Sequence, residues 1–343
     1  MTAPSSPLTI AQLAQLAGVS TATVSKVVNG RAEVSPETRA AVEELIRRHG
    51  YRRQRRRSPP TTLIELVFHA LEGDYPVEIT KGVTQIAHQH HLLVGITDLH
   101  HDPAAGDTWI DAALARRPTG VLAVFSGLTD HQHDRLARRE IPLVLIDPAD
   151  APAKTIPSVS AGNWHGGLTA TRHLIDLGHR RIAIITGPDA ALPSRARLDG
   201  YRTALDLAGL PTDPGLITGG DFLIEGGRTQ AHHLLTQPDP PTAIFATNDG
   251  QAIGVYHAAA QLGLRIPDDL SVIGFDDLPS IRWTIPPLTT IRQPLTQMAA
   301  AATTMLLHLA HHEPLPHHRL ELATELVIRA STAPPPHPRR RTR

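Results

Sequence analysis

Residues 8–51 read LTIAQLAQLAGVSTATVSKVVNGRAEVSPETRAAVEELIRRHGY, a stretch with closely spaced signals for the starts and ends of helices. Thr9 and Gln12 have the spacing of a capping box at the start of a first helix. Ser20 can cap a second helix after a glycine-containing turn, and Ser35-Pro36 can open a third. Because apolar residues recur at helical spacing in all three segments, the stretch predicts a helix-turn-helix unit braced by a third helix.

The second predicted helix has one face that suits the major groove of DNA. Its valines face the core of the unit, which leaves Thr21, Ala22 and Lys26 on the opposite face. Lysine donates to guanine acceptors and methyl groups contact thymine, so we predict that these three residues read bases. Short polar side chains and the arginines that follow the unit are predicted to contact phosphates: Ser20, Thr23, Ser25, Asn29, Arg52, Arg53, Arg55, Arg56 and Arg57. The alternative is a three-helix bundle that contacts protein.

The charge distribution supports DNA over protein as the partner of this unit. The chain of 343 residues has 33 basic and 33 acidic side chains, but residues 1–57 hold ten basic and four acidic ones. Residues 58–338 hold 19 basic and 29 acidic side chains, a net charge of −10. A basic head on an acidic body indicates that the head contacts a polyanion and the body does not.

Several classes of protein are excluded or disfavoured by composition and motifs. Cysteine is absent, which excludes disulfides and cysteine-based zinc sites, and no apolar run is long enough to span a membrane. The N-terminus lacks the pattern of a secretory signal, so a cytoplasmic protein is expected. Nucleophile-elbow, P-loop, dinucleotide-binding and zinc-protease motifs are missing, so we expect no enzyme, cofactor or metal site. The 21 histidines accompany 30 arginines against three lysines, a pattern that GC-rich coding explains.

Beyond the head, short apolar runs alternate with amphipathic segments long enough for crossover helices. This alternation predicts two doubly wound α/β lobes with parallel sheets. We predict strands at residues 63–68, 92–97, 120–125, 142–147, 181–186, 242–247 and 270–275. The two lobes together should form a ligand-binding domain over residues 63–330, after a head at 1–57 and the end of a basic, proline-containing linker at 58–62. The proline-rich basic tail, residues 331–343, is predicted to be disordered.

Polar residues follow the predicted strands, where ligands bind in sheets of this kind. They include Asp98, Ser126, Asp147, Asn248 and Asp276. Carboxylate and amide groups suit a neutral, hydroxyl-rich ligand better than a phosphate, which prefers glycine-rich loops and lysine. Each aspartate alone is more often a helix cap, but their clustering at one position in the topology favours a ligand site.

The chain resembles the LacI family of transcriptional regulators in both parts. The segment AGVSTATVSKVVNG within the head and the body motifs LGHRRIAIITGP, SRARLDGYRTAL, FATNDGQAIGVYHAAAQLGLRIPDDLSVIGFDD and PPLTTIRQP carry the resemblance. It implies a body similar to periplasmic sugar-binding proteins, with lobe 1 at 63–160 and 291–322 and lobe 2 at 161–290 and 323–330. It also implies ligand contacts by Asp147, Arg197, Asn248, Asp276 and Gln293, with Phe222 stacking on a sugar and Tyr75, Trp164 and Trp283 as further aromatic candidates.

The linker departs from the family pattern. The family has a Tyr-x-Pro-Asn segment leading to a hinge helix with a leucine that wedges into the minor groove. Here residues 51–62 read YRRQRRRSPPTT, without the Pro-Asn pair or the leucine, and Pro59-Pro60 disfavours a helix. We therefore expect weaker DNA kinking and a stronger salt dependence than is usual for the family. Lys26 is a second departure, because arginine is commoner at that position.

The sequence as a whole predicts a homodimeric repressor of carbohydrate uptake or catabolism genes, released from operator DNA by a small sugar bound between the lobes. The amino-acid sequence of the body is similar to that of regulators that respond to xylo-oligosaccharides, which makes these sugars candidate effectors. The alternatives are a solute-binding protein, which the head disfavours, and an unspecific DNA-binding protein with a vestigial sugar cleft.

Overall fold

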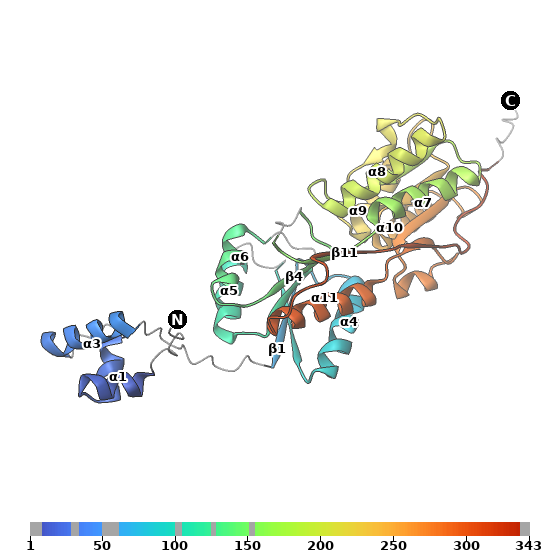
Figure 1. The fold of residues 1–343 in the computed structure, drawn as a ribbon. Coiled ribbons are helices and arrows are strands. Elements are labelled where there is room, and N and C mark those ends of the chain that lie inside the picture. Colours follow the sequence, from blue (N-terminus) through green and yellow to red (C-terminus); the bar gives the residue numbers. More distant parts are fainter. Residues whose placement is uncertain are drawn as a thin grey trace, which may run out of the picture. The chain divides into compact units, whose positions relative to one another are not determined.

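A computed structural model describes residues 9–28, 34–49, 62–99, 105–124, 128–150 and 155–336. The chain divides into two compact units, residues 1–59 and 60–343. The first contains three helices, and the second contains two α/β lobes (Figure 1).

The head is a three-helix unit whose boundaries follow the predicted caps. Its helices are α1 (Ile10–Ala17), α2 (Thr21–Val28) and α3 (Pro36–His49). Thr9 and Gln12 form both hydrogen bonds of the predicted capping box, and Gly18 ends α1 in a left-handed conformation. The three helices enclose a small apolar core of Leu13, Ala14, Val24, Val27 and Val42.

Lobe 1 is built on a six-stranded parallel sheet with the order β11-β5-β4-β3-β1-β2. Its core contains strands that are almost wholly apolar, because helices cover both faces of the sheet. In Figure 1, α11 lies beside α4 although more than 200 residues separate them in sequence. The elements of lobe 1 are β1 (Leu63–Phe68), α4 (Tyr75–Gln89), β2 (Leu93–Asp98), α5 (Ala105–Arg116), β3 (Gly120–Val124), α6 (Asp130–Ala137), β4 (Leu143–Ile146), β5 (Ser158–Ala161), α11 (Leu295–Ala310) and β11 (Arg319–Leu322).

Lobe 2 repeats this plan with the strand order β12-β10-β9-β8-β6-β7, in which only β12 runs antiparallel to its neighbour among the described strands. Its elements are α7 (Asn163–Asp176), β6 (Ile182–Ile185), α8 (Leu192–Leu207), the 3₁₀ helix η1 (Pro214–Leu216), β7 (Ile217–Thr218), α9 (Ile224–Leu235), β8 (Ala243–Ala246), α10 (Asp249–Gln261), β9 (Ser271–Asp276), the 3₁₀ helix η2 (Pro279–Trp283), β10 (Thr289–Arg292) and β12 (Glu325–Val327).

The two-lobed α/β class predicted from the sequence is confirmed, and the seven predicted strands match β1, β2, β3, β4, β6, β8 and β9 to within two residues at each end. The assignment of residues to lobes needs correction at two places. Ala161 completes β5 of lobe 1, and residues 291–292 complete β10 of lobe 2, because backbone pairing continues to those residues.

Helices α7 and α8 approach each other closely through two glycines. A Cβ atom on Gly167 would lie 2.3 Å from the carbonyl oxygen of Arg197, and one on Gly200 would lie 2.3 Å from that of Trp164. Such distances are sterically impossible, so any larger residue would force the helices apart. This close packing places Arg197 of α8 against the N-terminus of α7.

The segment that follows β12 packs against lobe 2, which corrects the start of the predicted disordered tail. Ser331 is fully buried and its hydroxyl donates to the Val272 carbonyl, while the Ala333 N–H donates to Ser271 Oγ. Buried His179 holds the same segment, because its imidazole contacts Thr242 Oγ1, Ser271 Oγ and the Ala333 carbonyl at 2.8–3.1 Å. Residues 331–336 are therefore ordered, and residues 337–343 lie outside the described part of the chain.

We predict that His179→Ala lowers the free energy of unfolding by about 2–4 kcal/mol, because it leaves buried hydrogen-bonding groups without a partner. Burial lowers the pKa of His179, so the folded protein binds this proton less readily than the unfolded chain does. The stability of the wild type should therefore fall as the pH drops below about 6.5, and the variant should lose part of this dependence. Urea unfolding at pH 7.5 and 5.5 measures both effects. Exposed His232→Ala is the control, and an equal loss in both variants would contradict the prediction.

Candidate functional site

The head presents a concave polar surface next to the exposed face of α2. A hollow of about 530 Å³ lies between the N-terminal parts of α2 and α3. A serine directly precedes each of these helices, and its hydroxyl accepts a hydrogen bond from a backbone N–H, Ser20 from Thr23 and Ser35 from Thr38. Helix N-termini attract anions, so the hollow suits a phosphate. Its lining comprises Val19, Ser20, Ala22, Thr23, Lys26, Val34, Ser35 and Thr38.

The hollow brings together several of the predicted DNA-contacting residues. Thr21 and Ala22 are exposed at the start of α2, and Lys26 lies one turn further on. Ser35 and Thr38 belong to the same surface but were not predicted. The serine at the start of the third helix had been read only as a cap, although a cap at a helix N-terminus can also face a phosphate. Asn29 and the five linker arginines, Arg52, Arg53, Arg55, Arg56 and Arg57, lie outside the described residues.

In the body, a buried hydrogen-bond chain runs from lobe 1 into lobe 2. Asp147 follows β4, and its Oδ1 accepts from Nδ2 of Asn163 at 3.3 Å, at the start of α7. The Asn163 Oδ1 accepts from Nε of Arg197 at 2.8 Å, and the Arg197 Nη1 donates to the Thr247 carbonyl at 2.5 Å. The guanidinium carbon also lies 3.8 Å from the centre of the Phe275 ring. Arg197 is thus fixed in position by two hydrogen bonds and one aromatic face.

A second pair follows the neighbouring strands of lobe 2. Asp276 ends β9, and its Oδ1 accepts from Nε2 of Gln293 at 2.5 Å, just beyond β10. The Asp276 carboxylate interacts electrostatically with Arg197 and with Asp147, so both pairs belong to one site. These residues lie at the carboxyl ends of their strands, where open α/β sheets bind ligands.

The site contains buried polar atoms that make no hydrogen bond within the described part of the chain. They are the Tyr75 hydroxyl and the Gln293 Oε1, and the buried Ser194 hydroxyl, one turn before Arg197 on α8, has no partner either. The Tyr75 hydroxyl approaches Asp147 closely enough to influence its pKa but does not reach hydrogen-bond geometry. A buried polar group without a partner costs about 1–3 kcal/mol, which a bound ligand with hydroxyl groups would recover.

The backbone around the site adopts unusual conformations. Positive φ angles are uncommon outside glycine and concentrate at functional sites. Four non-glycine residues with positive φ lie in or beside this site: Asp147 (48°), Phe222 (69°), Asp276 (120°) and Asp277 (62°). Asp277 forms ion pairs with Arg292 and Arg329, which anchor the strand end next to Asp276.

Burial governs the protonation of the carboxylates here. Burial raises the pKa of Asp276 to about 7, although Arg197 and the Gln293 hydrogen bond act in the opposite direction. Burial likewise raises the pKa of Asp147, again against the effect of Arg197. The pKa of Asp249, the first residue of α10, is also raised, by burial and by the nearby Asp276. The site therefore has more carboxylates than cationic partners, which disfavours an anionic ligand.

Other predicted residues take different positions. Asn248 caps α10 through the Gln251 N–H and donates to the Phe222 carbonyl, so it shapes the site edge rather than pointing a free amide into it. Phe222 lies over Gly187, with its ring centre 6.0 Å from the Arg197 guanidinium carbon. Asp98 is half-buried at the end of the edge strand β2. Trp164 is 38% exposed and Trp283 is 85% exposed, and Ser126 lies outside the described residues.

Two residues at the centre of the network were missed from the sequence. Asn163 follows β5, a strand too short and too polar to have been predicted, so nothing marked it as a strand-end residue. Asp249 directly follows Asn248 but was not among the predicted ligand contacts. Its carboxylate accepts from the Thr290 hydroxyl at 2.6 Å and from the Leu278 N–H at 2.8 Å, which ties together β10, α10 and the segment after β9.

Contacts across the two lobes flank the network. The Leu192 N–H of α8 donates to the Ala149 carbonyl of lobe 1 at 2.7 Å. On the other side, the Ser280 N–H donates to Asp74 Oδ2 at 3.0 Å, so Asp74 contacts lobe 2 instead of capping its own helix α4. Leu278 inserts into the apolar core of lobe 1. The site thus lies where relative movement of the lobes would make or break contacts.

Comparisons with known proteins identify both parts of the chain. Residues 9–54 match the family model described as bacterial regulatory proteins, lacI family, and residues 171–332 match the periplasmic binding protein-like domain. The chain is 34% identical over 330 residues to the ribose operon repressor of Escherichia coli K12, which covers 94% of this chain and 99% of that protein.

Solved structures give the same result. A transcriptional regulator CelR–cellobiose complex is 31% identical, with a TM-score of 0.73 and coverage of 94% of this chain and 99% of that one. The lac repressor dimer bound to operator and the anti-inducer ONPF is 28% identical, with a TM-score of 0.70 and coverage of 95% and 99%. Among the described residues, no helix is both long and apolar enough to cross a membrane.

Proposed function

The chain belongs to the lacI family of bacterial regulatory proteins and is accordingly a DNA-binding transcriptional repressor controlled by a small-molecule effector, and we propose that the effector is an uncharged sugar bound at the Asp147–Arg197–Asp276 network. The genes it controls would then be those for uptake or catabolism of that sugar. The solute-binding alternative is not favoured, because the relatives that match the full chain are repressors.

The proposal rests on one observation: the site has hydrogen-bond acceptors and negative charge that the protein's own donors do not fully satisfy. The Gln293 Oε1 has no donor, the carboxylates of Asp147 and Asp276 outnumber the single guanidinium, and Arg197 is already held by Asn163 and Thr247. Vicinal hydroxyls of a sugar supply such donors and carry no charge. A phosphate or carboxylate would supply none and would face carboxylates. Ribose and cellobiose are candidate effectors because they occur in the names of similar proteins, and xylo-oligosaccharides are candidates proposed from the sequence.

We also propose that the repressor acts as a homodimer, with each head reading half of a near-palindromic operator. Large apolar side chains are exposed in both lobes, on and just before α4, on the edge strand β2, at the start of α9, and in the region of η2. They include Leu71, Val77, Leu93, Ile96, Leu223, Ile224, Trp283 and Ile285. Exposed apolar surface of this kind marks protein interfaces. In a dimer with two-fold symmetry, the same side chains would be buried in both subunits. Equilibrium sedimentation of the purified protein tests the dimer.

The function itself is tested by fluorescence anisotropy on DNA from upstream of the gene and of neighbouring transport genes. The titrations use two salt concentrations, with and without ribose, cellobiose, xylobiose and the matching sugar phosphates. We expect tight binding to one fragment, relieved by one neutral sugar. The linker arginines should make binding strongly dependent on salt. Binding that is indifferent to both sequence and sugar would contradict the proposal.

We predict that the affinity for the sugar falls as the pH drops through about 7. The raised pKa of Asp276 means that the carboxylate is mostly protonated at pH 6 and mostly ionised at pH 8. Because a sugar hydroxyl donates to the ionised form, affinity should be roughly tenfold weaker at pH 6 than at pH 8. Isothermal titration calorimetry with the identified sugar measures this change. Asp276→Asn should bind weakly at both pH values, and a flat profile in the wild type would contradict the prediction.

A further inference from the structure

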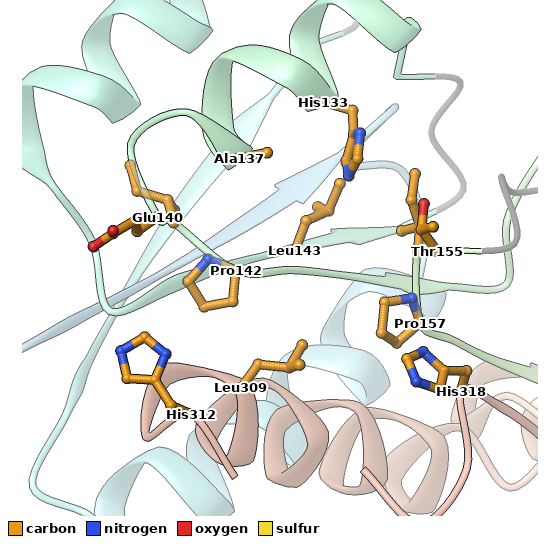
Figure 2. Close-up of a pocket in the computed structure, with 12 residues that line it drawn as sticks. His133, Ala137, Glu140, Pro142, Leu143, Thr155, Pro157, Leu309, His312 and His318 are labelled. Carbon is orange, nitrogen blue, oxygen red and sulfur yellow. The ribbon is translucent and has the colours of Figure 1, made fainter. Parts of the chain in front are cut away.

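Lobe 1 contains a cavity at the opposite end of its sheet from the Asp147–Arg197–Asp276 network. The cavity has a volume of about 370 Å³ and is partly open to solvent (Figure 2). It lies where β4 and β5 begin, whereas Asp147 follows the end of β4. The strand β4 spans about 13 Å at 3.3 Å per residue, which separates the two sites.

The floor of this cavity is apolar. Ile141, Leu143 and Ile156 line it, and they keep 5–8% exposure, whereas Val144 and Ile146 of the same region are fully buried. Protein atoms therefore do not cover these three side chains completely. The volume lies within the range of small-molecule pockets and is more than twice the roughly 150 Å³ that holds benzene in an engineered apolar cavity. A substituted ring or a bicyclic molecule would fit.

The carbonyl groups of the two prolines in the cavity wall already accept hydrogen bonds from the protein. The Pro142 carbonyl accepts from the Val121 N–H, and the Pro157 carbonyl accepts from the Leu145 N–H, so both are used by the sheet. Proline also lacks an N–H. A polar group of a ligand next to these prolines must then be recognised by the side chains around them.

The polar side chains around the cavity include several that can donate a hydrogen bond. Figure 2 shows the imidazoles of His133, His312 and His318 around the apolar centre formed by Leu143, Leu309 and the two prolines. Every imidazole has at least one N–H donor, and the Thr155 hydroxyl adds another. The carboxylate of Glu140 points away from this centre (Figure 2). Exposed Arg138 and Arg139 immediately precede Glu140 and offset its negative charge.

From this arrangement we infer that the cavity binds a small molecule with an apolar ring and one carboxylate, independently of the sugar site. The ring packs on Leu143, Leu309 and the proline rings, and the carboxylate accepts from the imidazoles at the rim. The first residue of β1, Leu63, lies at the same edge of the sheet, two strands from β4. A ligand here would occupy the edge at which the chain enters lobe 1.

The test uses trans-cinnamate as the probe and cinnamyl alcohol as its neutral match, titrated calorimetrically into the full-length protein. We expect cinnamate to bind, and cinnamyl alcohol to bind at least about tenfold more weakly, because hydrogen bonds to a charged group are lost. The double variant His312→Ala/His318→Ala should weaken cinnamate by a similar factor. Leu309→Trp should abolish binding by filling the cavity. His88→Ala, an exposed histidine of α4, is the control and should bind as the wild type does.

Each alternative outcome overturns the inference. Absence of cinnamate binding removes the site, and equal affinity for cinnamyl alcohol removes its preference for an acid. Unchanged binding in the double histidine variant, with native circular dichroism, shows that the probe lies elsewhere. Loss of binding in Arg197→Lys would place cinnamate in the sugar site, whereas retention of binding in that variant keeps the two sites distinct.

Discussion

Replacement of Arg197 by lysine is expected to weaken the response of the repressor to its sugar by about 100-fold while leaving operator binding in the absence of sugar intact. Lysine keeps the charge but loses the planar group that bonds Asn163 and Thr247 and lies on Phe275. A charge-assisted hydrogen bond from the guanidinium to the sugar, which depends on the position that these contacts give Arg197, is worth up to about 3 kcal/mol, which corresponds to roughly this factor. The network that links Asp147 to lobe 2 would also lose its central member.

The measurement is the sugar concentration that releases half of the bound operator, by fluorescence anisotropy. Arg195→Lys is a matched control, because Arg195 lies on the same helix two residues away and is exposed. Thermal unfolding and sugar-free operator binding report whether each variant is folded. A folded Arg197→Lys protein that is released at the wild-type sugar concentration would show that the network is not the effector site.

The second large effect is expected for Lys26→Ala. Lys26 lies on the solvent-facing side of α2 and lines the hollow between α2 and α3. A base contact is worth about 1–3 kcal/mol, and lysine, which donates from a single point, should be near the lower value. Two copies in a dimer then contribute about 2 kcal/mol, or roughly 30-fold in operator affinity.

Competition with unrelated DNA separates base reading from phosphate contact. A base contact is lost only on the operator, so Lys26→Ala should lower operator affinity much more than affinity for unrelated DNA. Lys81→Ala, on α4 in an ion pair with Glu78, is the control and should change neither. Equal weakening on both DNAs would reassign Lys26 to a phosphate. Lys26→Arg should bind at least as tightly as the wild type, because arginine can form a bidentate pair with guanine.

Much of the site could be predicted because its residues stand at ends of apolar strands. Asp147 and Asp276 follow β4 and β9, two runs whose burial on both faces makes them obvious in sequence. Arg197 and Gln293 came from the family resemblance, and the structure brings all four into one network. Trp283 does not join them, since an aromatic side chain in sequence gives no indication of whether it faces a ligand, a core or a partner subunit.

The caps of the head helices and the strongly apolar strands depend on neighbouring residues and were predictable from the amino-acid sequence, as were the charge contrast between head and body and the absence of cysteine. Five strands became evident from the fold alone, because each has two to four residues and pairs with a partner far away in the chain: β5, β7, β10, β11 and β12. The same long-range pairing places Asn163 beside Arg197 and buries His179 against residues 331–333. Local patterns encode helix caps and buried strands because those depend on nearby side chains. Which strand ends meet depends on parallel pairing across tens to hundreds of residues, for which no local pattern exists.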